Sequence, residues 1–71
     1  MVNYDKLREK VRESGITWRH IAKCLELSPP GLSAKVNGKS DFKADEIAKL
    51  RDVLHLKDDE FMAIFFAEDV A

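Results

Sequence analysis

One helix-start signature occurs twice in the first half of the sequence, and it limits the possible fold more than any other feature. The signature is a small hydroxyl residue with an apolar residue before it and another four positions after it, and it occurs as Ile16-Thr17 with Ile21 and as Leu27-Ser28 with Leu32. Such a residue caps a helix N-terminus, and the flanking apolar pair forms a hydrophobic staple. The repetition predicts two short helices in succession, over about 18–25 and about 29–36.

Apolar residues at helical spacing predict three more helices. The predicted ranges are 4–14, 44–54 and about 59–67. Asn3 and Asp58 can cap the first and the last of these helices, and Gly15 can end the first in the left-handed conformation. No segment has the alternating apolar pattern of a β-strand. The sequence therefore predicts an all-α chain of five helices in a single domain over residues 1–71.

The end of the third helix is marked by Asn37-Gly38, two residues that tolerate a positive φ. Residues 39–43 then form a predicted loop, in which Phe42 is expected to turn toward the core. His55 stands where the fourth helix ends, in the place that glycine often takes.

A chain of 71 residues has a thin core, because a domain of this size buries only about 60% of the surface that its unfolded chain exposes. A homodimer would add buried surface. The single cysteine, Cys24, cannot form an internal disulfide, and its place in the helical spacing predicts an inert core residue.

The charges are unevenly distributed along the chain. Residues 1–57 hold all twelve lysines and arginines against eight acids, a formal charge of +4, whereas residues 58–71 hold five acids and no base. A mildly basic body with an acidic tail permits nucleic-acid binding, which the net charge of −1 would conceal.

Other classes of protein find no support in the sequence. There is no nucleophile with a matching base, no phosphate-binding loop, and no partner at metal spacing for His20 or His55, so we expect a non-enzyme without cofactor, metal or small-molecule ligand. The N-terminus has charges where a signal peptide needs an apolar run, and the longest apolar run, 61–67, is too short to cross a bilayer. A cytoplasmic location is expected.

The stretch "GITWRHIAKCLELSPPGLSAKVNGKSDFKADEIAKL", residues 15–50, resembles the helix-turn-helix domain of the phage lambda repressor, Cro and XRE group. The residues that match the pattern of this group are Thr17, Ile21, Ala22, Leu25, Leu27, Ser28, Leu32, Ser33, Val36, Asn37 and Gly38. The resemblance extends over about residues 4–66. It implies a five-helix lambda repressor-like domain with a helix-turn-helix over about 17–37 that binds double-stranded DNA as a homodimer.

Two residues depart from the pattern of this group. Trp18 stands where the group usually has a glutamine that contacts a phosphate, and it is either a lid over the core or part of the DNA face. Glu26 replaces the glycine of the turn, so a non-glycine residue must adopt a left-handed conformation that costs roughly 1 kcal/mol.

The resemblance assigns DNA contacts to the starts of both short helices and to the end of the second. The candidate residues are Thr17, Trp18, Arg19, Ser28, Pro29, Pro30, Gly31, Ser33, Lys35, Asn37, Lys39 and Ser40. The prolines offer only apolar contact to bases and remove two N–H groups, so phosphate contacts and DNA shape are expected to contribute more than direct readout. Either Ser28 caps the helix, or Pro29 takes the cap position and the helix starts at Pro30.

The last predicted helix has more apolar residues than one face can hold. Phe61 and Phe65, one turn apart, are expected to reach the core. Met62, Phe65 and Phe66 are assigned to a dimer interface within about residues 58–67. The alternative is that Met62 and Phe66 close over the first helix.

Three functions fit these features. The first is a sequence-specific transcriptional regulator of the Cro or repressor type from a phage or prophage, acting on a two-fold operator. The second is a protein-binding module, such as an antirepressor or an antitoxin-like protein, that keeps the fold but binds DNA weakly or not at all. The third is an architectural DNA binder without sequence preference, for which a body of charge +4 is weakly basic.

Overall fold

The computed structural model describes residues 2–66, and within them the chain forms five helices and no strand. The helices are α1 (Tyr4–Ser14), α2 (Trp18–Cys24), α3 (Pro29–Val36), α4 (Ala44–Leu54) and α5 (Asp58–Phe65). The all-α, five-helix prediction is confirmed, with the last helix beginning one residue earlier than expected and ending before Phe66. The remainder of its predicted range, residue 67, lies outside the described residues.

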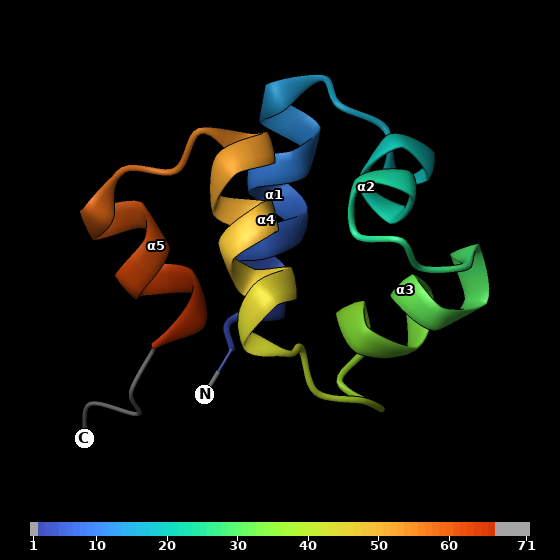
Figure 1. Cartoon of the computed structure of the whole chain (residues 1–71). Helices are drawn as coiled ribbons and strands as arrows, with labels where there is room; N and C mark the ends of the chain where they lie inside the picture. Colours follow the sequence, from blue (N-terminus) through green and yellow to red (C-terminus); the bar gives the residue numbers. More distant parts are fainter. Residues whose placement is uncertain (1, 67–71) are drawn as a thin grey trace.

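Helices α1 and α4 lie against each other in the middle of the domain (Figure 1). Helix α5 packs on α1 at one side, while α2 packs on α4 and carries α3 at the other side. The side chains of Leu7, Ile21 and Leu50, from α1, α2 and α4, are completely buried where these helices meet. Because α2 and α4 hold it from one side, α3 lies at the edge of the domain.

Two helices begin as the sequence predicts, and the third begins according to one of its two alternatives, with Ser28 as the cap. The side chains of Asn3 and Thr17 accept hydrogen bonds from backbone N–H groups three residues later, each at 3.1 Å, and Ser28 does the same at 3.2 Å. A cap of this type satisfies one of the N–H groups that a helix start leaves unpaired.

The fourth and fifth helices begin differently. Lys43 and Lys57 hold the cap positions, and their N–H groups donate to the carboxylates of Glu46 and Glu60 at 2.8 Å and 3.0 Å. The prediction that Asp58 caps the last helix is therefore wrong. Asp58 is the first residue of α5, and its carboxylate forms an ion pair with Arg51 of α4.

Two helices end in the left-handed conformation at residues other than glycine, Glu26 with φ 58° and His55 with φ 51°, as the sequence predicts. After α2, the N–H of Leu27 donates to the carbonyl of Ala22 at 2.8 Å, which is the long bond of a Schellman motif. This tight ending fixes the direction in which the chain leaves α2 and therefore the placement of α3.

Two contacts hold α1 against α5. The N–H of Asn3 donates to the carbonyl of Ile64 in α5 at 2.6 Å. Lys10 of α1 pairs with Glu60 of α5, and their hydrogen bond raises the pKa of Lys10 and lowers that of Glu60. Helices α1 and α5 are thus joined at both the start and the middle of α1.

The loop before α4 contributes to the core as predicted. Phe42 is half-buried and packs edge-on against the ring of Phe65, with centroids 6.2 Å apart. Gly38, with φ 79°, ends α3, whereas Asn37 keeps a negative φ of −92°. The ring of Tyr4 lies where a side chain on Gly38 would point, so the end of α3 is held against the start of α1.

Among the described residues, no helix has both the length and the apolar character needed to cross a membrane. Nor does this part of the chain bring three or more histidine, cysteine, aspartate or glutamate side chains together in a way that could hold a metal ion.

Candidate nucleic-acid interface

The start of α3 has no free backbone donor. Pro29 and Pro30 occupy its first two positions and have no N–H, and the N–H of Gly31 donates to the Ser28 hydroxyl oxygen. The next N–H, that of Leu32, already bonds to the carbonyl of Ser28 at 2.9 Å. Ser28 is therefore the cap, and the alternative with Pro29 in that position is wrong. A phosphate at this helix start would find no amide to bind.

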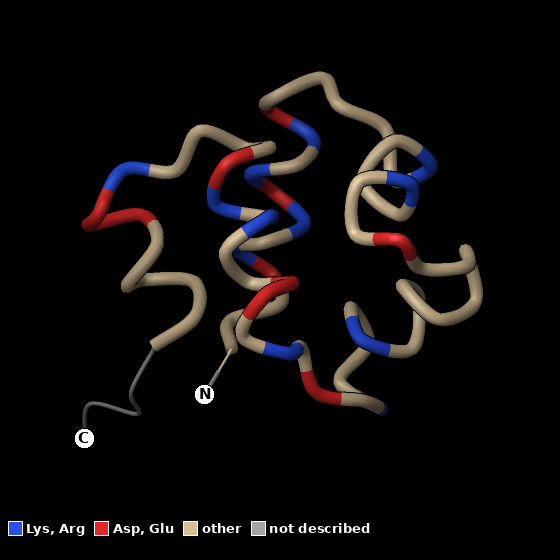
Figure 2. Tube along the Cα trace, in the orientation of Figure 1, with Lys and Arg blue, Asp and Glu red and all other residues tan. Residues whose placement is uncertain are grey.

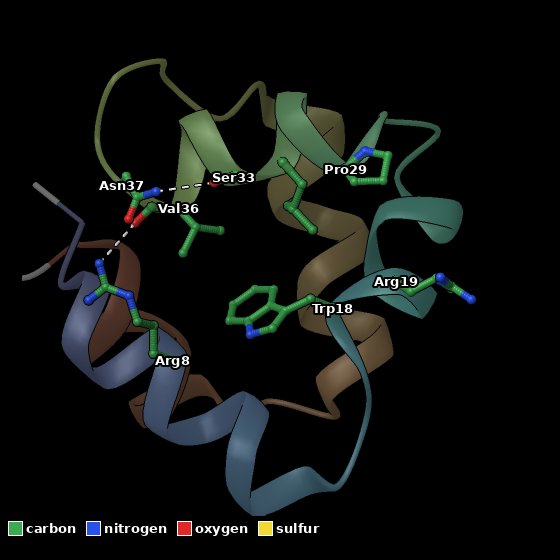
Figure 3. A pocket seen from close by; sticks show the side chains of 8 residues that line it. Arg8, Trp18, Arg19, Pro29, Ser33, Val36 and Asn37 are labelled. Atoms are coloured by element: carbon green, nitrogen blue, oxygen red, sulfur yellow. Dashed lines mark hydrogen bonds between the residues drawn. The ribbon is translucent and has the colours of Figure 1, made fainter.

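The outer side of α3 and the segment after it are open to solvent. The exposed candidate residues are Pro29, Pro30, Ser33, Asn37, Lys39 and Ser40. Gly31 is half-buried, and Leu32 and Val36 hold the inner side of the helix in the core. The amide nitrogen of Asn37 donates to the Ser33 hydroxyl oxygen at 3.2 Å, so these two polar side chains form one unit on the outer side (Figure 3).

Lys35 does not belong to this exposed group, and its assignment as a DNA contact is corrected. Its side chain is only 12% exposed, and its ammonium forms an ion pair with Glu46 of α4. Burial acts to raise the pKa of Glu46, but the hydrogen bonds from Lys35 and from the Lys43 backbone outweigh it, so this pKa is lower than usual. The pair fastens α3 to α4 and leaves α3 without an unpaired cation.

At the start of α2, Thr17 and Arg19 are exposed, whereas Trp18 is half-buried. Thr17 uses its hydroxyl oxygen as the cap acceptor for His20. Arg19 forms no ion pair with any residue in the described part of the chain. Trp18 packs against the core, as the first of its two alternatives expects, and it also lines a surface hollow.

This hollow is a groove of about 440 Å³ between α1, α2 and α3 (Figure 3). It is lined by Arg8, Trp18, Arg19, Pro29, Leu32, Ser33, Val36 and Asn37. Four candidate residues exposed on α2 and α3 thus meet at one surface, together with Trp18. The lining has two arginines and no acid.

Arg8 is the lining residue that the sequence did not suggest. One guanidinium nitrogen donates to Asp5 at 3.0 Å, and the other lies 3.5 Å from the carbonyl oxygen of Val36 at the end of α3. The available signal was the position of Arg8 directly after the buried Leu7, at the edge of the inward face of α1. Arg8 becomes part of the groove only because α3 packs across that edge of α1, which the sequence alone does not show.

Cys24 packs against the core, as the sequence predicts, but it is only partly buried. Its Sγ lies 3.5 Å from Nε2 of His20, one turn earlier on α2. The fully inward positions of α2 are held instead by Ile21 and Ala22.

The apolar residues of α5 divide into two groups. Phe65 is 4% exposed and packs between Phe61 and Phe42, so its assignment to a dimer interface is corrected: it is a core residue with almost no surface to offer a second copy. Met62 and Phe66 are 54% and 53% exposed. About half of each side chain is thus open to solvent, the ring of Phe66 packs on that of Phe61 with centroids 5.7 Å apart, and both residues remain candidates for a contact between copies.

Taken together, the geometry defines a small all-helical domain with a two-helix unit, α2 and α3, at its edge and a partly basic groove beside that unit. Residues 1–68 match the model of a protein family described as "Protein of unknown function (DUF739)", and the chain belongs to this family. No curated protein and no solved structure matches the chain.

Proposed function

We propose that the chain is a sequence-specific DNA-binding transcriptional regulator of the lambda repressor and Cro type, with α2 and α3 as its helix-turn-helix. The observation that carries the proposal is the outer side of α3 and the segment after it, where Pro29, Pro30, Ser33, Asn37, Lys39 and Ser40 are exposed, while Leu32 and Val36 anchor the helix from within. A helix mounted in this way can enter a major groove without disturbing the core. Arg19 and Lys39, both exposed, lie at either end of that surface.

The regulator would act in the cytoplasm as a homodimer on a two-fold operator. Met62 and Phe66 offer apolar surface for a contact between copies, and two copies of α3 would enter successive major grooves about 34 Å apart. Occupation of a promoter would then exclude the polymerase. In this proposal the protein needs no catalytic group and no cofactor.

The test is selection of bound duplexes from a random pool, followed by titration of the selected duplex across a salt series. A palindromic consensus and an affinity that falls as salt rises are expected, because phosphate contacts release counterions. Absence of duplex binding, or an affinity that stays flat between low and moderate salt, would contradict the proposal.

Charge-neutralising variants sharpen the test. Arg19→Gln and Lys39→Gln are expected to weaken binding to the selected duplex, each reducing the slope of log affinity against log salt by about 0.9 if it contacts one phosphate. Lys57→Gln is the matched control, since this exposed lysine precedes α5, on the other side of the domain (Figure 2). Lys35 is unsuitable for this purpose, because its substitution would leave the buried carboxylate of Glu46 without its ion-pair partner.

One observation favours the second candidate, a protein-binding module such as an antirepressor or an antitoxin-like partner. Helix α3 has a single basic residue, Lys35, and that residue is engaged by Glu46, while its first three residues have no side-chain donor. Such a surface suits an apolar protein partner as well as a base edge. In this case Arg19→Gln and Lys39→Gln would leave partner binding unchanged and no duplex would be selected.

A further inference from the structure

The groove between α1 and α3 has two chemical characters. Its walls are apolar where Trp18, Leu32 and Val36 line it, the guanidinium of Arg8 stands at one end, and Arg19 borders the other end (Figure 3). In the figure, the indole of Trp18 extends from α2 into the space between α1 and α3, with Arg8 beyond it, whereas Arg19 extends away on the other side. A ligand that fits has alternating apolar and anionic parts.

From this arrangement we infer that the groove holds a stretch of the sugar-phosphate backbone of duplex DNA, with Arg8 of α1 as a phosphate ligand. The inference rests on the proposed function and adds a binding residue from outside the two-helix unit. The C–H face of a deoxyribose is the part that would pack against Trp18, and the phosphate next to it is the anionic part that the Arg8 guanidinium can bind in a bidentate manner.

The contacts of Arg8 suit this role. Its side chain is 43% exposed, and a guanidinium has five N–H donors, of which Asp5 and the carbonyl of Val36 engage two. Asp5 is 95% exposed, so solvent weakens its hold on Arg8. The two contacts orient the guanidinium across the gap from α1 to α3 and leave donors for an anion.

A second groove on the molecule does not share the combination of apolar walls, basic residues and absence of acids that the groove beside α3 has. The hollow of about 280 Å³ between α1 and α5 is lined by Lys6 and Lys10, but also by Glu9, Glu13, Asp59 and Glu60. Four carboxylates would repel a phosphate there. The groove beside α3 has no acid in its lining, so the sign of its charge complements a nucleic-acid backbone.

Trp18 makes the groove directly observable, because it is the only tryptophan of the chain. Its fluorescence reports whether a ligand lies against its ring, without any label. We expect duplex DNA to change the intensity or the wavelength of this emission, and we expect inorganic phosphate and a mononucleotide to leave it unchanged at concentrations where the duplex saturates.

The decisive comparison is Arg8→Met against Arg12→Met, in the full chain and with the duplex selected above. Methionine keeps much of the arginine stem, and Arg12 is an exposed base on the same helix that does not line the groove. Arg8→Met is expected to lower affinity roughly tenfold and to reduce the salt slope by about 0.9, the effect of one lost phosphate contact. Arg12→Met is expected to match the unsubstituted chain in both measurements.

The outcomes separate the two proposals. If the unsubstituted chain binds no duplex, the proposed function and this inference both fail. If the chain binds duplex DNA but Arg8→Met behaves as Arg12→Met, or if the duplex leaves Trp18 emission unchanged, the inference alone fails. If a mononucleotide changes the emission as strongly as the duplex does, the inference also fails, and the groove binds a small organic anion instead of the DNA backbone. Circular dichroism and urea unfolding of both variants check that each variant is folded under the conditions of the binding measurements.

Discussion

The ion pair between Lys35 and Glu46 offers the sharpest test of how α3 is held in place. Glu46 is 5% exposed, the Lys35 side chain is 12% exposed, and the carboxylate also accepts the N–H of Lys43 at 2.8 Å. Lys35→Met keeps the apolar stem and removes the charge. It leaves a buried carboxylate with a single hydrogen bond.

Loss of one partner from a buried pair costs about 3–5 kcal/mol. We expect the lower end, about 3 kcal/mol at pH 7, because Glu46 keeps the hydrogen bond from Lys43 and the Lys35 position is not completely dry. A domain of this length has a total stability of roughly 4–10 kcal/mol, so the variant remains folded with its free energy of unfolding greatly reduced. The same loss would lower its melting temperature by at least about 12 °C.

The direction in which the unfolding free energy changes with pH shows whether the buried carboxylate of Glu46 causes the loss of stability. In the unsubstituted chain the pKa of Glu46 is lowered, so its contribution to stability is present above the unfolded pKa and is lost as pH falls through the folded pKa. In Lys35→Met the burial of Glu46 is no longer outweighed by the lysine, and its pKa is expected to rise. The variant therefore regains stability as pH falls from 7 toward about 4, the range of an unfolded glutamate. The difference in unfolding free energy between the two proteins therefore becomes smaller as pH falls, because the variant gains stability and, at lower pH, the unsubstituted chain loses it.

Urea unfolding of four proteins checks this reasoning: the unsubstituted chain, Lys35→Met, Glu46→Gln and the double variant. Glutamine keeps an amide oxygen for the N–H of Lys43 and has no charge to bury. We expect the double variant to be more stable than Lys35→Met at pH 7, although it has one more substitution. The unfolding free energies of Lys35→Met and the unsubstituted chain are compared at pH 7 and at about pH 4. A difference below about 1 kcal/mol at pH 7, as for a surface pair, would refute the buried-pair interpretation, and so would a difference that is the same at both pH values.

Three further predictions follow from the caps and exposed residues. Gly38→Ala is expected to cost about 1–2 kcal/mol in urea unfolding, because φ is 79° and the new Cβ would lie 3.3 Å from a tyrosine ring of α1; Gly15→Ala, with φ 74° and no atom within 4 Å, measures the backbone part alone and should cost less. Ser28→Ala is expected to cost about 1 kcal/mol, whereas Ser28→Asp should keep the cap; equal losses for both would show that the hydroxyl does not cap α3. Met62→Lys is expected to shift any dimer toward monomer in sedimentation and, at concentrations where the chain is monomeric, to leave the unfolding free energy nearly unchanged, because Met62 is 54% exposed; Phe66 is left in place because its ring packs on that of Phe61, and unchanged self-association would place the contact elsewhere.

Features fixed by near neighbours in the chain could be predicted from the sequence. The caps at Asn3, Thr17 and Ser28 depend on residues three positions away, whereas the left-handed conformation of Glu26 is implied by the resemblance, in which this position is the glycine of the turn. The last helix shows the limit of this reasoning. Asp58 has the chemistry of a cap, but Arg51 engages it, and Glu60 satisfies the helix start instead.

The composition of the candidate site depends on packing between helices, which spacing alone does not give. The sequence predicts Lys35 as a DNA contact because it lies on the helix expected to meet DNA, yet Lys35 lies between Leu32 and Val36 at the flank of the inward side. Glu46 lies at a similar flank of α4, beside the half-buried Ile47. Two opposite charges at the flanks of facing helices are a signal for a buried pair, but only when the facing of α3 and α4 is known.

The chemistry of the two ends of α3 sets what the proposed regulator can read. At its start, the prolines and the capped Gly31 offer a base neither a side-chain donor nor a backbone N–H, so only shape and contact with a thymine methyl remain. At its end, the amide of Asn37 and the ammonium of Lys39 are exposed. In the proposed regulator, direct readout by hydrogen bonds is therefore expected from the end of α3 and the segment after it, and the remaining discrimination from DNA that bends to reach the cations around the groove. An operator for such a protein is expected to have few invariant bases per half-site and a pronounced preference for flexible steps.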